Sequence, residues 1–350
     1  MTKSAKAWLG AFLLALSLAG PGAGQTPQPW VIVVSKPPPP VVPSDPPQGL
    51  IYQLRPDLSA SEVSFDTSGG PTSLEYLQFS ADGSAAITFD DGPNEGNPGG
   101  VMIADNFLGR SGGHFDSEHD RLISGEKAGL LEPKDLALAP GAIIVADFGA
   151  ARLSVFDLDA EGDAAPRFTK ALGLTGGEPR RPWGLAFDAA KDRLFVGATD
   201  GAVLVFDKFL SQGGETSRII IPSANGQKIS ANAHDLVYLK NQDLLIVSDV
   251  GAATTPDQPG FETDGAVYTI RNAGQAEGHT GVDVYLSGPN SLLGNPVGLA
   301  FSGGSLFVTE RTKDVVLRFD DFLSLGHADA APDAALTVPV PEAVVLTPGF

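Results

Sequence analysis

A pattern of three short apolar strands returns about every fifty residues along most of this chain. One copy comprises 182–187, 193–196 and 201–207, each rich in aliphatic or aromatic residues and bounded by Gly, Asp or Pro. Short apolar runs with such boundaries are typical of successive antiparallel strands. Related copies lie at 134–138, 143–147 and 152–157; at 234–238, 244–249 and 265–270; and at 297–301, 306–310 and 315–320. Repeats of this length, with about four strands each, predict the blades of a β-propeller.

The spacing of the first strand in each copy indicates six blades. The apolar residues at the centre of that strand are Leu77, Leu136, Leu185, Leu236, Leu299 and Val344. The last copy has only a first strand, at 341–346, whereas three unmatched strands at 30–35, 50–54 and 63–65 precede the first copy. One blade is therefore predicted to combine strands from the N- and C-terminal parts of the chain, which leaves no open sheet edge in the ring. The prediction is an all-β, six-bladed β-propeller of four-stranded antiparallel blades.

The first residues of the chain have the composition of a secretory signal peptide. Lys3 and Lys6 precede an apolar run over 7–18, and small residues follow it. A run of this length is too short to span a bilayer, although an uncleaved anchor is the alternative. We therefore expect a signal peptide at 1–24, one propeller domain at 25–350, and a secreted, periplasmic or cell-envelope location.

The chain is acidic, with a formal net charge of −19, and it contains no cysteine. Nucleic acids and anionic membranes are poor partners for such a charge, and a cation or a basic or neutral partner fits better. The absence of cysteine excludes disulfides and thiol catalysis. We expect a monomer that does not insert into a membrane after signal cleavage. The proline-rich stretch 37–47 reads as a stiff loop within the shared blade.

The segments 133–136, 143–147 and 152–156 together resemble an NHL repeat. The layout of six copies with a shared blade is similar to the six-bladed propellers of NHL proteins, gluconolactonase/regucalcin-type enzymes and paraoxonases. This resemblance covers nearly all of the chain after residue 24. It implies the fold, but it is compatible with two kinds of function, because these propellers include both hydrolases and binding scaffolds.

The resemblance also implies where chemistry would occur, at the top of the central channel. The matching positions there are Glu75, Lys134, Trp183, His234, Val297 and Glu342, and Asp135 and Asp235 follow two of them. Carboxylate and imidazole groups at these positions could gather round a divalent ion such as Ca²⁺. The candidate ligands are Glu75, Asp135, His234, Asp235 and Glu342.

Three channel residues depart from the lactonase pattern. Trp183 stands where that pattern has Asn, Val297 replaces another polar ligand, and Lys134 brings a competing cation. The alternative is a narrow polar channel in which Lys134 pairs with Glu75 or Asp135, and we favour this alternative over a catalytic metal.

Two acidic loops are candidate surface metal sites. The first has alternating acidic residues with the spacing of a calcium loop, but it lacks the distal glutamate and is otherwise a solvated turn. Its residues are Asp157, Asp159, Glu161 and Asp163. The second, at 114–120, contains two histidines and three acids. Both loops join third to fourth strands, so we expect them on the face opposite the channel mouth.

The mouth itself combines cations with an indole. Arg180 and Arg181 precede Trp183, and His234 is predicted to lie beside them. Arginine and tryptophan are enriched in recognition surfaces, although Trp183 could equally pack into the inner core. Long loops at 36–48, 91–99 and 250–264 are expected to rim the same face and are not counted among these residues.

We therefore predict an exported binding module that acts through its channel mouth. Its partner would be another exported protein, a glycan or a small molecule. The alternatives are a metal-dependent hydrolase of lactones or esters and a structural scaffold of the cell envelope. No serine–histidine–aspartate elbow, phosphate loop or dinucleotide fingerprint is visible.

Overall fold

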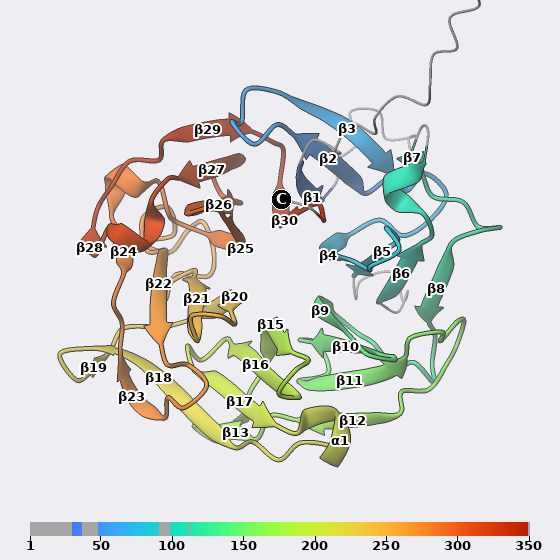
Figure 1. Ribbon diagram of the computed structural model, residues 1–350, viewed down its shortest axis with the longest axis horizontal. Coiled ribbons are helices and arrows are strands. Elements are labelled where there is room, and N and C mark those ends of the chain that lie inside the picture. The colour runs from blue at the N-terminus through green and yellow to red at the C-terminus, as the bar shows by residue number, and fades with distance from the viewer. Residues whose placement is uncertain (1–29, 37–47, 91–98, 111–112, 349–350) are drawn as a thin grey trace, which may run out of the picture.

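The computed structural model describes residues 30–36, 48–90, 99–110 and 113–348. The predicted signal peptide and the proline-rich stretch lie outside these residues. Six antiparallel sheets stand around a central axis like the blades of a propeller, which confirms the predicted fold (Figure 1). No helix in the described part of the chain is long and apolar enough to cross a membrane.

Each blade has four main strands, which run from the channel to the rim. Blade 1 contains β4 (Leu74–Phe79), β5 (Ala85–Phe89), β6 (Gly100–Ala104) and β8 (Arg121–Ser124). Blade 2 contains β9 (Pro133–Ala139), β10 (Ala142–Asp147), β11 (Arg152–Asp157) and β12 (Phe168–Ala171). Blade 3 contains β15 (Pro182–Asp188), β16 (Arg193–Ala198), β17 (Val203–Asp207) and β18 (Arg218–Ala224), and β19 (Gln227–Lys228) extends it.

The other three blades follow the same plan. Blade 4 contains β20 (Ala233–Leu239), β21 (Leu244–Asp249), β22 (Ala266–Arg271) and β24 (Tyr285–Ser287). Blade 5 contains β25 (Pro296–Ser302), β26 (Ser305–Glu310), β27 (Val315–Phe319) and β29 (Ala334–Thr337). Blade 6 contains β30 (Pro341–Leu346), β1 (Val31–Ser35), β2 (Leu50–Leu54) and β3 (Ser61–Asp66). The short helices are η1 (Phe107–Gly109), α1 (Phe209–Gln212), η2 (Pro289–Ser291) and η3 (Phe322–Ser324).

Blade 6 closes the ring with strands from both ends of the described chain, as predicted. β30 pairs antiparallel with β1, and Val33 lies opposite Val344. The backbone N–H of Trp30 also donates to Thr347 Oγ1 over 2.9 Å. The inner strand of this blade therefore comes from one end of the propeller sequence and its three outer strands from the other.

Short parallel strands cover the rims of three blades. β7 (Gly113–His114) pairs with β3, β23 (Gly278–Gly281) with β18, and β28 (His327–Ala328) with β24. In each case the added strand belongs to the connection that leads to the fourth strand of the following blade. Such pairing protects outer sheet edges that would otherwise be open.

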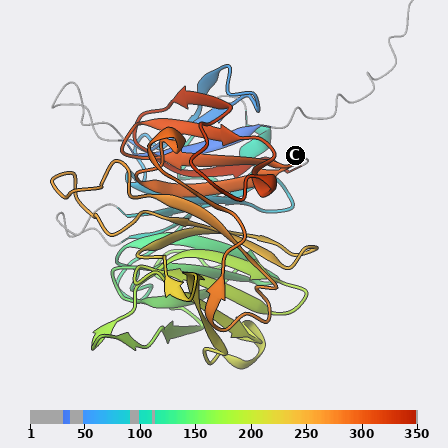
Figure 2. The same ribbon diagram turned by 90° about the vertical axis from the view of Figure 1, so that its left-hand side faces the viewer.

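The two faces of the ring carry different connections. Loops between second and third strands lie on the mouth face, and loops between third and fourth strands lie on the opposite face. Figure 2 shows the ring from the side, with the loop 250–264 and the hairpin of β13 (Leu174–Thr175) and β14 (Glu178–Pro179) projecting in the same direction. The acidic loops at 114–120 and 157–163 follow third strands, so the structure places both opposite the mouth, as expected.

Apolar side chains from the second strands fill the spaces between blades. One position in this strand pairs with the residue just after the first-strand anchor and is buried in all six blades. It holds Ile144, Phe195, Ile246, Phe307 and Ile32 in blades 2 to 6. In blade 1 the equivalent residue is Ala86, which pairs with Gln78. The core between blades 1 and 2 thus receives a much smaller side chain than any other.

Candidate binding site at the channel mouth

A bulge near the mouth end interrupts the first two strands of every blade. The pairing register shifts at Leu74/Tyr76, Pro182/Leu185, Ala233/Leu236, Pro296/Gly298, Ala146/Asp147 and Val34/Ser35. A bulge leaves a residue unpaired and redirects its side chain. The six predicted channel residues lie at these bulges, so the same local irregularity directs all of them toward the axis.

Lys134 forms the centre of a buried ion network. Its Nζ lies 2.7 Å from Glu75 Oε1 and also contacts Asp90 Oδ2, which confirms the predicted pairing with Glu75. Lys36 Nζ reaches the same Glu75 oxygen at 2.6 Å. Burial alone would raise the pKa of Glu75, but Lys134 and Lys36 outweigh it and hold that pKa at about 2. Burial lowers the pKa of Lys134 less than Glu75 and Asp90 raise it, so this ammonium stays charged.

Glu342 faces two cations across the mouth. Its Oε1 lies 3.0 Å from Arg311 Nε and 3.6 Å from Lys36 Nζ. Burial dominates at this carboxyl and raises its pKa to about 7, with Lys36 opposing the shift and Glu75 adding to it. Glu342 is therefore close to its titration point at neutral pH.

Asp135 and Asp235 connect neighbouring blades. Asp135 accepts hydrogen bonds from Leu136 N at 2.5 Å and, in the next blade, from Leu185 N at 2.6 Å. Asp235 does the same with Leu236 N and Leu299 N, each at 2.6 Å. Both carboxyl groups are buried, and each joins its own inner strand to the following one.

Burial controls the titration of these two aspartates. It raises the pKa of Asp235 to about 7, against the lowering effect of its two backbone donors. It raises the pKa of Asp135 further, with the nearby Asp235 carboxylate as the second cause.

Trp183 is the centre of an aromatic cluster at the mouth. Its ring stacks on His234 at a centroid distance of 3.8 Å and an interplanar angle of 14°, and Phe148 meets it edge-on at 5.4 Å. Lys134 Nζ lies 5.5 Å from the indole, and the Arg181 guanidinium lies 4.9 Å from the Phe148 ring. Trp183 remains half-buried, so it serves both the inner core and the accessible surface.

His234 is a neutral ring at physiological pH. Burial lowers its pKa to about 3, and Arg311 and Lys134 lower it further. Its Nδ1 has no hydrogen-bond partner among the described residues. The imidazole can therefore accept or donate one hydrogen bond to a group that approaches it.

The five candidate metal ligands do not form a ligand set in this structure. Among the described residues there is no group of three or more Asp, Glu or His side chains that could hold a metal ion. Glu75 and Glu342 contact cations, Asp135 and Asp235 bind backbone amides, and His234 stacks on an indole. The cavity between these side chains measures about 10 Å³, close to the minimum for one water molecule.

The acidic loop of blade 2 does not converge on a common point either. Asp157 pairs with Arg167, and Asp163 Oδ1 accepts hydrogen bonds from Lys127 N at 2.6 Å and Ala128 N at 3.1 Å. Asp159 lines a pocket away from both. Glu161 is exposed and makes no ion pair with a described residue.

The two mouth arginines have different surroundings. Arg180 Nε pairs with Asp200 Oδ2 at 2.8 Å. Arg181 Nη1 donates to the backbone carbonyls of Phe148 and Gly149, at 2.8 and 3.2 Å. Arg181 has no carboxylate partner among the residues that the structure describes.

Lys36, Arg311 and Phe148 belong to the site but were not predicted. Each directly follows a second strand, at Ser35, Glu310 and Asp147 respectively. The signal that could have found them is therefore positional, because the residue after the second strand lies at the mouth in every blade. The acids at these strand ends have a structural role: Asp147 accepts from Glu132 N at 3.0 Å.

Comparisons with known proteins identify the fold and no family. No family model matches the chain, and no curated protein matches it. Its structure is similar to a chain in the crystal structure of a nidogen/laminin complex, with a TM-score of 0.59 and 13% identity over 91% of this chain and 98% of that one. The likeness is one of fold. A putative 6-phosphogluconolactonase from Bacteroides fragilis gives a TM-score of 0.56 and 11% identity, over 93% of this chain and 99% of that one.

The buried carboxyl groups predict a stability that falls as pH rises. Because the folded protein raises the pKa of Asp235 and Glu342 to about 7, it binds more protons than the unfolded chain between about pH 4 and 7. Their contribution is complete below pH 4 and is lost as pH rises through 7. Glu75 acts in the opposite sense, but only as pH falls from 4.5 toward 2. We expect the free energy of unfolding in urea to drop by about 2–4 kcal/mol from pH 5 to pH 8.

The variants Asp235→Asn and Glu342→Gln should each flatten this pH dependence. Removal of a charge from the exposed Glu277 by Glu277→Gln is the matched control and should leave the slope unchanged. Equal slopes in all four proteins would show that the buried carboxyl groups do not cause the effect.

Proposed function

We propose that this protein is an exported binding module that holds its partner against the channel mouth of blades 2 to 5. The observation that carries this proposal is the half-buried Trp183, which Phe148 and His234 fix in place beside Arg181. An aromatic ring held rigidly by its neighbours loses little conformational entropy on binding, which favours it as an interface anchor.

Unused polar atoms near this ring support a binding role. Asn232 Oδ1, His234 Nδ1 and Thr312 Oγ1 are buried and lack a hydrogen-bond partner among the described residues. All three belong to the mouth ends of blades 4 and 5. Buried polar atoms without a partner are rare in folded proteins, so ordered water or a ligand's polar groups would be expected there.

Exposed apolar side chains continue the surface over blades 2 and 3. Leu131 is 54% exposed and Leu174 is 65% exposed, the latter on the β13–β14 hairpin. Leu131 lies against Gly149, whose carbonyl accepts from Arg181. The mouth thus offers an apolar strip beside an anchored indole and a guanidinium, the composition of a recognition surface.

The resemblance to gluconolactonase-type propellers keeps a hydrolase as the alternative. Such an enzyme needs a metal and room for substrate in the channel, whereas the cavity there is about 10 Å³ and its acids have protein partners. Metal content is the direct test, with the variant Glu75→Gln/His234→Ala beside the native protein. About one divalent ion per chain, lost in the variant, would favour the hydrolase.

The binding proposal predicts that Trp183→Ala removes most of the affinity for any ligand of the mouth. Glycan arrays and a displayed peptide library provide defined probes, and affinities are then measured by calorimetry. We expect at least a tenfold loss for Trp183→Ala and a smaller loss for Trp183→Phe, with Arg181→Ala also weakened.

The control for this test is Val63→Ala, which alters an exposed apolar residue on blade 6. It should bind as the native protein does. A ligand that binds native protein and Trp183→Ala equally would place recognition elsewhere, provided that circular dichroism shows the variant to be folded.

A further inference from the structure

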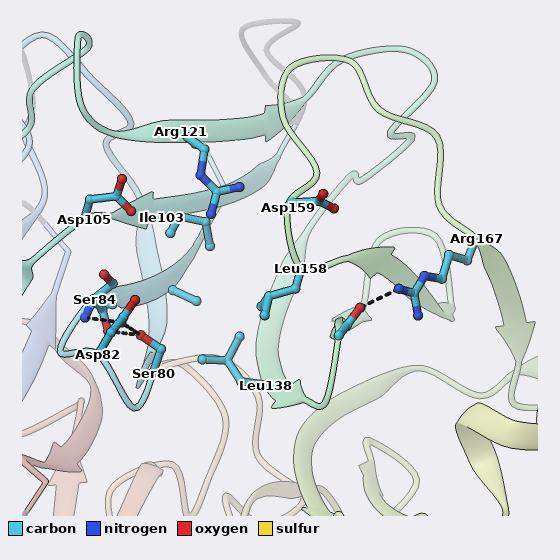
Figure 3. A pocket seen from close by; sticks show the side chains of 13 residues that line it. Ser80, Asp82, Ser84, Ile103, Asp105, Arg121, Leu138, Leu158, Asp159 and Arg167 are labelled. Carbon is cyan, nitrogen blue, oxygen red and sulfur yellow. Dashed lines mark hydrogen bonds between the residues drawn. The ribbon is translucent and has the colours of Figure 1, made fainter.

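A cavity of about 500 Å³ opens between blades 1 and 2 on the face opposite the channel mouth (Figure 3). This volume lies within the range of small-molecule sites. The cavity is far larger than the space inside the channel, and it shares no residue with the mouth.

The cavity exists because blade 1 lacks a large side chain that every other blade has. Ala86 lines it, and the equivalent position is an isoleucine or a phenylalanine in the other five blades. The missing side chain leaves space beside Ile103 and Leu138. The floor of the cavity is therefore part of the packed ring and is not a gap between loops.

One guanidinium with unused donors enters this cavity. Arg121, at the start of β8, donates from Nη1 to the Ala160 carbonyl at 3.0 Å, and its other N–H groups have no partner in the described part of the chain. By contrast, Arg167 is occupied by Asp157 and the Gly141 carbonyl. Figure 3 shows Arg121 extending into the cavity from above.

Two carboxylates with no partner stand on either side of Arg121. The Asp105 and Asp159 side chains make no hydrogen bond or ion pair with described residues, and Figure 3 shows them flanking the guanidinium. Asp82 is different, because it accepts hydrogen bonds from Ser80 Oγ and from Ser84 N at 3.0 Å. The available polar groups are thus one cation and two anions above an apolar floor.

We infer that this cavity binds a free α-amino acid with an apolar side chain. The ligand carboxylate would pair with Arg121, because charge-assisted hydrogen bonds to guanidinium are strong and directional. Its ammonium would lie between Asp105 and Asp159, and its side chain would fill the space beside Ala86. A simple carboxylic acid would leave the two aspartates facing its own charge, and a simple amine would leave Arg121 without a partner.

Calorimetry with the purified protein tests each contact separately. L-Leucine and L-phenylalanine should bind, whereas leucine amide lacks the carboxylate, N-acetyl-leucine lacks the ammonium and glycine lacks the side chain. We expect each of these three probes to bind at least tenfold more weakly than leucine. No heat from leucine or phenylalanine at about 10 mM would overturn the inference.

Two variants locate the site. Ala86→Phe should abolish leucine binding without lowering the melting temperature, since phenylalanine occupies the equivalent position in blades 3 and 5. Arg121→Gln should weaken leucine at least tenfold and leave leucine amide unchanged. Trp183→Ala is the control from the other face and should bind leucine normally. Leucine binding that survives Ala86→Phe or is lost in Trp183→Ala would overturn the inference.

Discussion

Replacement of Lys134 by methionine is expected to lower the free energy of unfolding by about 3–5 kcal/mol. The side chain of Lys134 is 8% exposed, and its ammonium is shared by Glu75 and Asp90. Without it, Glu75 would keep only Lys36, and the charge near Asp90 would no longer be balanced by Lys134. Buried carboxylates that lose a partner are costly because the protein interior solvates them poorly. Urea unfolding monitored by circular dichroism measures the loss.

The variant Lys134→Met/Glu75→Gln/Asp90→Asn separates charge imbalance from simple loss of packing. If the unbalanced carboxylates cause the loss, the triple variant should recover most of it, because neutral groups of similar size replace the charges. Lys127→Met removes an exposed lysine and should change stability by less than about 0.5 kcal/mol. A native-like stability of Lys134→Met would contradict a structural role for the network.

Gly184→Ala is expected to destabilise the ring by about 3 kcal/mol. A Cβ at Gly184 would lie 2.1 Å from the carbonyl oxygen of His234 and 2.8 Å from Asp235 Cα. Both contacts are backbone atoms of the next blade, so no side-chain rotation can relieve them. The inner strands of blades 3 and 4 would have to separate near Trp183 and the channel mouth.

Gly281→Ala is the matched control for this prediction. A Cβ there meets nothing within 4 Å, so its unfolding free energy should stay close to that of the native protein. Thermal and urea unfolding of both variants would compare the effects directly. Equal stabilities for the two variants would mean that the blades can move apart at no cost.

The ring could be predicted from the sequence because its cause is local and repeated. Short apolar strands with turn residues between them recur in every blade, and Leu77 and Leu185 occupy the same place in their repeats. The shared blade could also be predicted, since 30–35 and 341–346 supply complementary strands that are missing at opposite ends. Each inference needed only alternating patterns along the chain.

The chemistry of the channel could be predicted only in part, because it depends on contacts between blades. The pairing of Lys134 with Glu75 was predicted, but the contributions of Lys36 and Arg311 come from loops of other blades. An aspartate such as Asp235 has the same letter whether it binds metal or the backbone of the next blade. Sequence patterns within one repeat carry no information on that choice.

The cavity beside Ala86 shows a second limit of the same kind. The sequence contains the difference, because the equivalent positions hold isoleucine or phenylalanine. Its meaning appears only when the strand register aligns these positions and the structure places Arg121 and Asp159 around the space. An exception in a repeat is thus informative once the geometry of the repeat is known.

The two-ended blade 6 has a consequence for how the chain folds. β30 completes a sheet whose other strands precede it by five whole blades, and the bond between Trp30 and Thr347 joins residues 317 positions apart. A nascent chain would hold β1, β2 and β3 without their inner neighbour until all the remaining blades had been synthesised. Contacts of such long sequence separation slow folding and make its completion all-or-none. We therefore expect the propeller to acquire its final stability in one late cooperative step, unlike a linear repeat array, which can gain stability unit by unit.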